Sequence, residues 1–339
     1  MFPCPDSIHT GRLVIASNRA GPHARGMTIS PSPGRPRLIL RTGALHAGYD
    51  DDEIRRLRRA GAWTSVLRGA YVPTADMPRL NAPDRHRLLI QTLLPRLSGD
   101  PVVSHVSAAV LHGLPLWLTH VNEVHVTRRP PAKAHRGPMV HSYTSALETD
   151  DVVLVGHRAV TSAARTVLDV ARTIPFEQAV VVADAALRAR RTTPDQLAAQ
   201  LTRVCRMPGA RDAARVIKFA DGRSESVGES RSRVMLHRAG LPPPELQLAV
   251  HDDDGLLLGR ADFGYRRRKV LGEFDGRAKY AGGFGVGETP GEAAFREKVR
   301  EEALRAAGWA VVRWIWVDLD SPEAVVRRIQ RALGRGGRP

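Results

Sequence analysis

The alternation of apolar and polar positions begins near Leu38, after a stretch dominated by Gly, Pro, Ser and Arg. Residues 1–37 hold too few apolar side chains to bury a core, and we predict a flexible tail there. Apolar residues then recur at helical spacing over 42–48 and over 51–60, and a glycine closes each run. The segment 63–72 alternates around an Arg-Gly pair, which predicts two short strands joined by a tight turn.

The second of these helices combines a narrow apolar side, which includes Ile54, with a dense basic surface. Asp50 and Glu53 form a capping pair at its start. The basic positions are Arg55, Arg56, Arg58 and Arg59 on the helix and Arg68 at the turn between the strands. This order is typical of a winged helix-turn-helix, in which a helix enters the major groove of double-stranded DNA and a hairpin contacts the adjacent backbone. We therefore predict such a domain over 38–80, the alternative being a solvated basic helix on an ordinary three-helix fold.

The middle of the chain, 81–221, is predicted to be an α/β domain. Helical periodicity and one proline at a first helical position predict helices at 88–97, 104–113, 162–173, 176–188 and from 193 onward. Short extended runs are predicted at 123–127 and 152–155. His105 and His112 lie seven residues apart on one predicted helical face, but no Cys or carboxylate completes a metal site at suitable spacing, which favours ordinary packing.

Beyond Ser224 the pattern changes to helix, three strands, helix, strand, helix. Ser226 and Glu229 form a capping box for the first helix, which is predicted to run to Arg238. The remaining elements are predicted at 245–250, 256–265 and 269–275 for the strands, from Thr289 to before Gly308 for the long helix, at 310–317 for the last strand and at 322–333 for the last helix.

Acidic residues occupy unusual positions in two of these strands. Asp262 interrupts an otherwise apolar strand, and Glu273 and Asp275 lie in the next one. Because strand side chains alternate, Glu273 and Asp275 face the same side as Leu271. Two carboxylates on one face of a mostly apolar strand repel each other and resist burial unless a cation compensates their charge.

A hard divalent cation such as Mg²⁺, or Mn²⁺ in its place, requires such an oxygen cluster, and it would activate water for attack on a phosphodiester. We predict Asp262, Glu273 and Asp275 as the metal ligands, with Glu229 as a supporting carboxylate and Lys279 meeting the phosphate.

Three other cationic side chains bear on this prediction. Lys269 and Arg277 are further candidates for neutralising the phosphate. The competing interpretation for Asp262 and Glu273 is a structural salt bridge with Arg260 or Arg277, and for Glu229 it is the capping box alone.

The charge of the chain favours acidic polymers as partners. Lys and Arg number 51 against 35 Asp and Glu, a formal net charge of +16. Residues 1–100 carry 15 basic and 8 acidic side chains, residues 101–200 carry 10 and 8, and the remainder carry 26 and 19, so both ends are basic. Cys4 and Cys205 form neither a disulfide framework nor a metal quartet, and the sequence lacks a membrane span or a secretory signal. We expect a cytoplasmic protein.

The run from Glu229 through GRADF and GEFDGRAKY to EALRAAGWAVVRW resembles the very-short-patch-repair-like branch of the PD-(D/E)xK nucleases. The resemblance implies a restriction-endonuclease-like three-layer α/β core over 222–339 and Mg²⁺-dependent cleavage of phosphodiester bonds. By resemblance Asp262 takes the metal-bridging role, Glu273 that of the second metal ligand and Glu229 that of the helix carboxylate. The sequence departs from the family at Asp275, which stands where the family has a lysine; Lys279 from beyond the strand is the candidate substitute.

The front half resembles the AbiEi-like antitoxins of type IV toxin–antitoxin systems, through RGAYV, SAAVLHGLP and VTSAARTVLDVA. This resemblance implies a DNA-binding regulator, with a cognate toxin as a further partner, and it assigns no catalytic residue.

Together these patterns predict an α/β multidomain protein with an N-terminal winged helix-turn-helix, an α/β middle domain and a C-terminal endonuclease-like core. The predicted activity is Mg²⁺-dependent cleavage of DNA by a metal-activated water. The alternative is a non-catalytic transcriptional regulator or antitoxin with a degenerate nuclease-like domain, and the missing strand lysine is the feature that separates the two. RNA or a branched intermediate is the other open substrate class.

Overall fold

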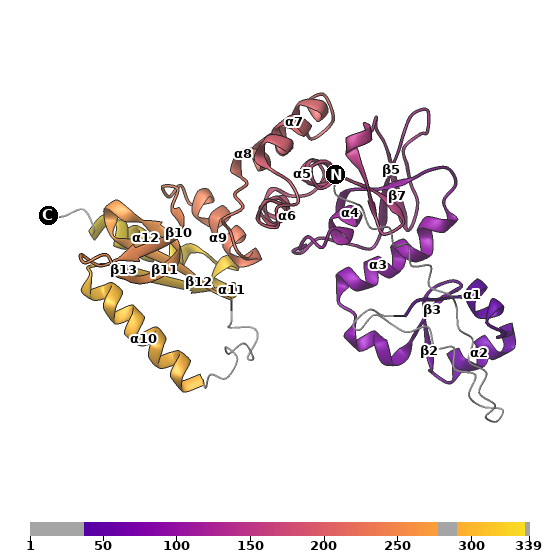
Figure 1. Cartoon of the computed structure of the whole chain (residues 1–339), viewed down its shortest axis with the longest axis horizontal. Helices are drawn as coiled ribbons and strands as arrows, with labels where there is room; N and C mark the ends of the chain where they lie inside the picture. Colours follow the sequence, from indigo (N-terminus) through magenta and orange to yellow (C-terminus); the bar gives the residue numbers. More distant parts are fainter. Residues whose placement is uncertain (1–36, 277–289, 336–339) are drawn as a thin grey trace, which may run out of the picture. The chain divides into compact units, whose positions relative to one another are not determined.

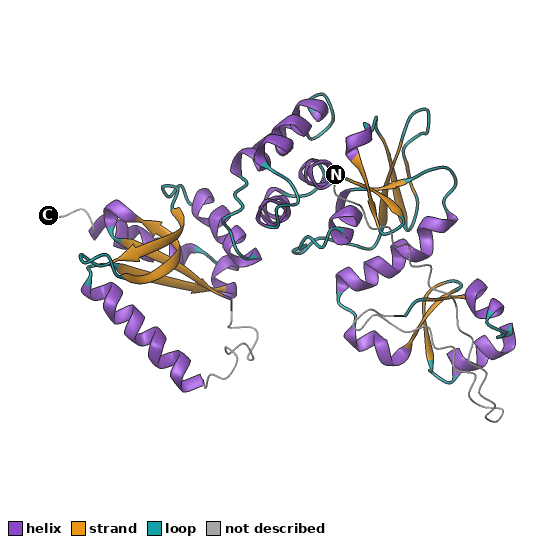
Figure 2. Cartoon of the chain, viewed as in Figure 1, coloured by secondary structure: helices purple, strands orange, loops and turns teal. Residues whose placement is uncertain are grey.

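The computed structural model describes residues 37–276 and 290–335 (Figure 1). The predicted N-terminal tail, apart from its last residue, falls outside the described residues, as do Arg277 and Lys279. The chain divides into two compact units, 1–78 and 79–339, and each unit is a mixture of helices and strands (Figure 2). The protein is therefore a mixed α/β protein.

The first unit is a small sheet covered by two helices. Its elements are β1 (Ile39–Leu40), α1 (Arg41–His46), α2 (Asp51–Arg59), β2 (Trp63–Leu67), β3 (Ala70–Pro73) and the 3-10 helix η1 (Thr74–Arg79). The strands are antiparallel in the order β1-β3-β2. Ala44, Ile54 and Tyr71 form the core, with Trp63 packed against them. The predicted helices and strand pair are confirmed.

The second unit begins with a six-stranded sheet in the order β6-β7-β5-β4-β9-β8. The strands are β4 (Val102–Val103), β5 (Val124–Arg128), β6 (His135–Arg136), β7 (Val140–Thr144), β8 (Val152–Val155) and β9 (Arg158–Thr161). The helical elements beside them are α3 (Ala82–Leu93), η2 (Leu94–Arg96), α4 (His105–Leu111) and η3 (Thr149–Asp151). Ile90, Val103, Ala108 and Val126 are among the side chains of the core between this sheet and α3 and α4.

A group of helices follows this sheet. It comprises α5 (Ala163–Ala171), α6 (Phe176–Arg188), α7 (Pro194–Val204), α8 (Ala210–Phe219) and α9 (Val227–Arg238). The core of the group includes Leu168, Val182 and Leu197. Val234 of α9 belongs to the same core, and Arg233 of α9 binds Asp184 of α6 at 2.6 Å. The helix that opens the last part of the chain is thus packed into the helical group as well.

The last part of the chain is a four-stranded sheet in the order β10-β11-β12-β13. Its elements are β10 (Glu245–His251), β11 (Leu257–Tyr265), η4 (Arg266–Arg268), β12 (Val270–Asp275), α10 (Pro290–Ala306), β13 (Ala310–Ile315), α11 (Trp316–Asp320) and α12 (Glu323–Arg335). Strands β10, β11 and β12 are antiparallel to their neighbours, whereas β12 and β13 are parallel. A parallel pair requires a crossover, and α10 provides it.

Helices cover both faces of this sheet. On one face Phe263 and Trp314 pack with Leu236 of α9 and Ile329 of α12. On the other face Leu271 packs with Leu304 of α10. The sheet is therefore the middle of three layers. The predicted strand at 310–317 ends at Ile315, because Asp318 accepts a hydrogen bond from the Ile315 N–H at 2.9 Å and starts α11.

No helix within the described ranges is long and apolar enough to cross a membrane.

Candidate functional site

The predicted acidic cluster lies where β11 and β12 separate. The two strands pair from Tyr265 opposite Val270 to Phe263 opposite Gly272, and the regular pairing stops there. At the next position, Asp262 Oδ2 accepts a hydrogen bond from the backbone N–H of Phe274 at 2.8 Å. A side chain thus replaces the carbonyl that would have continued the ladder. The carboxylate of Asp262 is held beside β12 by this contact.

The pKa of Asp262 is raised to about 6, mainly by burial of its carboxyl group. The hydrogen bond from Phe274 opposes this shift, and the negative charges of Glu229 and Glu273 add to it. Asp262 on β11 is thus coupled to a carboxylate on α9 and to another on β12. A cluster of this kind favours the approach of a positive charge.

Glu229 forms hydrogen bonds both at the start of α9 and with the sheet. Its Oε1 accepts from the Ser226 hydroxyl and its Oε2 from the Glu225 N–H, both at 2.8 Å. Ser226 caps the Glu229 N–H as predicted, but the return bond of a capping box, to the Ser226 N–H, goes to Glu225 instead. The Nε2 of Gln247 on β10 also donates to Oε2, at 2.8 Å. The carboxylate is 7% exposed and connects the start of α9 to the strand that lies next to Asp262.

Gln247 is a site residue that the sequence analysis did not find. It bonds Glu229 and also lowers the pKa of Asp262 by a side-chain hydrogen bond. Its φ is +54°, in the left-handed region that non-glycine residues rarely adopt within a strand. Leu246 and Leu248 on either side consequently pack into the cores on opposite faces of the sheet. A polar side chain opposite Asp262 in the hairpin was the only available signal.

Glu273 is held by two arginines. Arg300 Nη2 lies 2.7 Å from Oε1 and Arg313 Nε lies 2.8 Å from Oε2. Arg300 comes from α10 and Arg313 from β13, and both also bind Glu297. The salt-bridge interpretation therefore holds for Glu273, with partners that the sequence analysis did not name.

Arg260, one of the arginines expected to form that salt bridge, binds a different residue. Arg260 binds Glu225 at 2.8 Å rather than Asp262 or Glu273. Arg300 and Arg313 are 27 and 40 residues beyond Glu273, a separation that only the crossover through α10 closes.

The remaining residues of the predicted site are spread more widely. Asp275 is exposed at the end of β12. The prediction that Lys269 neutralises a phosphate beside the acids is wrong, because it precedes β12 and its Nζ donates to the Ala307 carbonyl at 3.0 Å. Lys279 and Arg277 lie outside the described residues. Within the described ranges, no group of three or more His, Cys, Asp or Glu side chains has the geometry of a metal site.

The arginines of α2 form the second predicted site. All four are exposed, as is Arg68 in the turn between β2 and β3. Arg55 binds Asp52, and the guanidinium of Arg58 lies 5.7 Å from the ring centre of Tyr71. The guanidinium groups of Arg56 and Arg59 make no hydrogen bond or ion pair with any other described residue. Two of the predicted cations are thus free to meet an external anion.

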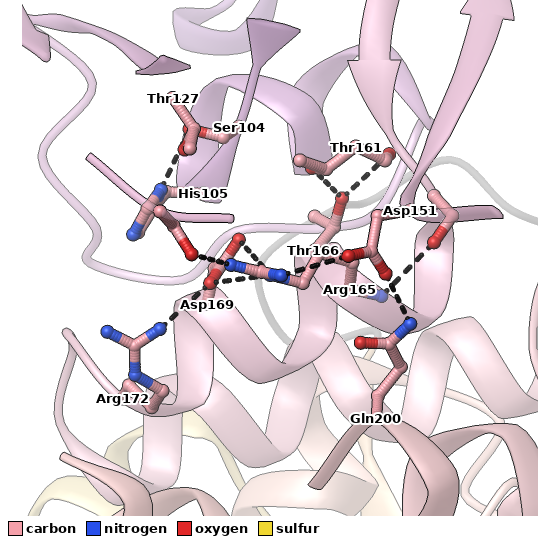
Figure 3. Close-up of polar contacts among 12 residues, drawn as sticks. Ser104, His105, Thr127, Asp151, Thr161, Arg165, Thr166, Asp169, Arg172 and Gln200 are labelled. Carbon is pink, nitrogen blue, oxygen red and sulfur yellow. Dashed lines mark hydrogen bonds and ion pairs between the residues drawn. The ribbon is translucent and has the colours of Figure 1, made fainter. Parts of the chain in front are cut away.

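A buried ion cluster joins α5 to its neighbours in the middle of the chain (Figure 3). Arg165 is 3% exposed and binds Asp169 and Asp151, both at 3.1 Å. Gln200 Nε2 donates to Asp151 at 2.5 Å, and Arg172 binds Asp169 at 3.0 Å. Every charge in the cluster has a partner of opposite sign, which identifies a structural element rather than an open site.

The two histidines considered in the sequence have separate partners. His105 Nδ1 lies 2.9 Å from the Ser104 hydroxyl, and its ring stacks on Tyr143 at 3.7 Å. His112 Nε2 lies 2.7 Å from the Thr161 carbonyl. Their rings are thus engaged in packing and in local hydrogen bonds.

The fold and the cluster together define a mixed α/β protein in which α9, β11 and β12 each contribute a carboxylate near the point where β11 and β12 stop pairing. Over 243 residues the chain is 30% identical to the uncharacterized proteins MT2308 and Rv2248 of two Mycobacterium tuberculosis strains, which covers 70% of this chain and 83% of each relative. The chain belongs to the family of these mycobacterial proteins. No family model matches it. The crystal structure of the RV2827C protein from M. tuberculosis is similar with a TM-score of 0.36 and 14% identity, over 66% of this chain and 86% of that one.

Proposed function

We propose that this protein binds DNA and that its last part, 222–339, is a Mg²⁺-dependent endonuclease domain with a restriction-endonuclease-like core. The order of α9, three antiparallel strands, α10 and a parallel fourth strand is the order that the nuclease resemblance implies. The observation that carries the proposal is the position of the half-buried Asp262, which accepts from the Phe274 N–H of β12 next to Glu273, while Gln247 of the neighbouring strand binds Glu229. These are the three acidic positions that the resemblance assigns.

The donor atoms of this cluster suit a hard cation. Asp262 and Glu273 offer only oxygen, and burial near other carboxylates raises the pKa of Asp262, which favours a bound cation. Asp262 and Glu273 would hold the ion, with Asp275 assisting from the end of β12. When bound, Mg²⁺ or Mn²⁺ supplies an activated water and charge neutralisation at the phosphodiester.

The protein's own residues orient this cluster. The Phe274 N–H fixes one oxygen of Asp262, and Gln247 connects Asp262 with the buried Glu229. In this arrangement Arg300 and Arg313 neutralise Glu273, so the cation must compete with two guanidinium groups for its oxygens. Lys279, the substitute for the family's lysine, remains part of the proposal from outside the described residues.

We propose that the segment 38–80 is a winged helix-turn-helix that contacts double-stranded DNA. Arg55, Arg56, Arg58 and Arg59 cover the exposed side of α2, and Arg68 lies at the tip of the β2–β3 hairpin. The helix would enter the major groove and the hairpin would contact the adjacent backbone.

Incubation of the purified full-length protein with supercoiled plasmid tests the nuclease. We expect nicking with Mg²⁺ or Mn²⁺, no nicking with chelator, and loss of nicking in Asp262→Asn, which preserves the size of the side chain. Asp253→Asn is the matched control, because Asp253 is exposed in the β10–β11 turn. Equal nicking by Asp262→Asn would refute this assignment of the site.

The second candidate is a non-catalytic transcriptional regulator or antitoxin that acts with a cognate toxin. The observation that favours it is the double arginine contact of Glu273, which suits a permanent structural ion pair. Tight binding to its own promoter without metal-dependent nicking would select this candidate over the endonuclease.

A further inference from the structure

A cavity of about 580 Å³ lies beside the turn between β11 and β12. Its wall includes Tyr265 at the end of β11, the η4 turn Arg266–Arg268, and Gln330 and Leu333 of α12. The volume falls within the range of small-molecule sites. The cavity is on the α9 and α12 side of the sheet, whereas Arg300 of α10 meets Glu273 on the other side. Asp262, Glu273 and Glu229 are not among the residues that line it, so the cavity is separate from the acidic cluster.

The hydroxyl of Tyr265 is a buried donor without a partner among the described residues. The side chain is 9% exposed, and its oxygen makes no hydrogen bond there. Leaving a buried hydroxyl unsatisfied is unfavourable, so such groups usually have a partner or mark a binding site. Tyr265 is part of the cavity wall, but its hydroxyl has almost no accessible surface, so a ligand oxygen reaches it as an acceptor only after a local movement of the wall.

The charged residues of the cavity wall are three arginines and Glu245, a balance that favours an anion. Arg266, Arg267 and Arg268 follow Tyr265 directly, and all three are exposed. Glu245 neutralises Arg266 at 3.1 Å. The guanidinium groups of Arg267 and Arg268 have no hydrogen bond or ion pair with any other described residue. Guanidinium groups bind phosphate oxygens through paired hydrogen bonds, and the cavity therefore suits a phosphate better than a neutral ligand.

The cavity also has an apolar wall, which suits the organic part of a phosphate ester. Pro242, Pro243 and Leu333 are apolar and line the same cavity. We propose that this cavity binds a phosphate monoester of nucleotide size, with its phosphate on the Tyr265 hydroxyl and the Arg267 and Arg268 guanidinium groups and its organic part against the prolines. The phosphate belongs either to a free mononucleotide or to the 5′ end of a nucleic-acid strand.

Calorimetric titration of the full-length protein in the presence of chelator tests this site, since the proposed nuclease cannot act there. The probes are deoxyadenosine 5′-monophosphate, deoxyadenosine, and a short single-stranded oligonucleotide with and without a 5′-phosphate. We expect at least about tenfold weaker binding of each probe that lacks the phosphate, because it loses the charged hydrogen bonds. Retained mononucleotide binding identifies a free nucleotide as the source, whereas binding of the phosphorylated oligonucleotide alone identifies a strand end.

Variants locate the site. The double variant Arg267→Gln/Arg268→Gln is expected to weaken binding at least about tenfold, and Tyr265→Phe severalfold, with Arg211→Gln on α8 as an exposed control that leaves it unchanged. Because both arginines are exposed, we expect the double variant to fold, and circular dichroism checks this. Equal affinity for phosphorylated and unphosphorylated probes, or an equal effect of Arg211→Gln, would overturn the proposal.

Discussion

Single residues decide the chemistry of the acidic cluster. Asp262 is buried enough for its pKa to reach about 6, and one backbone N–H and one glutamine amide hold it. Gln247 adopts its left-handed conformation at the same place. Strain of about 1–3 kcal/mol at such a residue persists only where the surroundings impose it, and it is frequent at functional sites. We therefore infer that Gln247 positions Asp262 and Glu229 and does not stabilise the fold.

Replacing Gln247 with glycine separates these two roles. Gln247→Gly is expected to leave the free energy of unfolding within about 1 kcal/mol of the wild type, because glycine adopts positive φ without strain. It is expected to lower the maximal nicking rate, because Asp262 and Glu229 lose the amide between them. Urea denaturation and plasmid nicking as a function of DNA concentration measure the two effects. A changed half-saturating DNA concentration with an unchanged maximal rate would contradict a positioning role.

Arg300 is expected to compete with the cation for Glu273. Arg300→Gln removes one of the two guanidinium groups on that carboxylate, so a severalfold lower Mg²⁺ concentration should give half-maximal nicking. Arg305→Gln on the same helix is the control, since Arg305 is exposed and binds Glu301 instead. A higher Mg²⁺ requirement in Arg300→Gln would show that Arg300 supports the site instead of competing for it.

Elements are joined by buried charge as well as by apolar packing. Helix α5 carries Arg165 and Asp169; Arg165 binds Asp151 in the segment before β8, and Asp151 in turn accepts a hydrogen bond from Gln200 of α7 (Figure 3). Removal of one partner from such a cluster leaves an uncompensated buried charge. The cluster therefore fixes α5 against two other elements.

Asp169→Ala is expected to lower the free energy of unfolding by about 3–5 kcal/mol, because Arg165 and Arg172 lose a shared carboxylate. Asp212→Ala on α8 removes an exposed pair with Arg215, and we expect a change below about 1 kcal/mol there. Urea denaturation of both variants measures the difference. Equal effects would mean that the buried cluster contributes no more than a surface pair.

The arginines of α2 predict how the affinity for DNA depends on salt concentration. Each phosphate contact changes the slope of log affinity against log salt by about 0.9 on duplex DNA. Arg56→Gln/Arg59→Gln should therefore reduce the slope by about 1.8 if both contact phosphate. Arg206→Gln/Arg211→Gln is the control for net charge, because it removes two exposed arginines outside α2. Fluorescence anisotropy with labelled duplex at several salt concentrations measures the slope, and an unchanged slope would exclude this face of α2 as the interface.

At the scale of the whole molecule, buried neutral histidines connect stability to pH. Burial lowers the pKa of His86 to about 4 and that of His125 to about 3. His86 is fully buried between Val121 and Ser107, with its two ring nitrogens 2.6 and 2.8 Å from their oxygen atoms. In the unfolded chain these histidines regain a pKa near 6.5.

The unfolded state then binds more protons than the native state below about pH 6.5, so stability falls as the pH falls. We expect His86 alone to contribute about 1.4 kcal/mol of lost stability per pH unit between about pH 6 and 4. The stability contribution of neutral His86 is present in full above its unfolded-state pKa of about 6.5, and it is lost as the pH falls from about 6 to 4. His86→Asn should flatten the dependence, as measured by urea denaturation at stepped pH. A parallel dependence in the variant would assign the effect to other groups.

The sequence by itself determined most elements, because their signals are local. Asp50, Ser226 and Thr193 each cap a helix where the pattern places one, and alternation located β11 and β12. The predicted strand at 310–317 extended too far, because the Asp318 side chain bonds the Ile315 N–H and begins a helix within an apolar run. The two-residue strands β4 and β6 are too short to carry a periodic signal.

Only the tertiary structure decided which charges meet. Alternation correctly put Glu273 on the same face as Leu271, but Arg300 and Arg313 reach it through the α10 crossover, which no local pattern reveals. Lys269 is close to Glu273 in sequence, yet it precedes β12 and bonds Ala307. Gln247 meets Glu229 because β10 and α9 converge in space. Periodicity assigns a side chain to a face, whereas its partners depend on how distant segments pack.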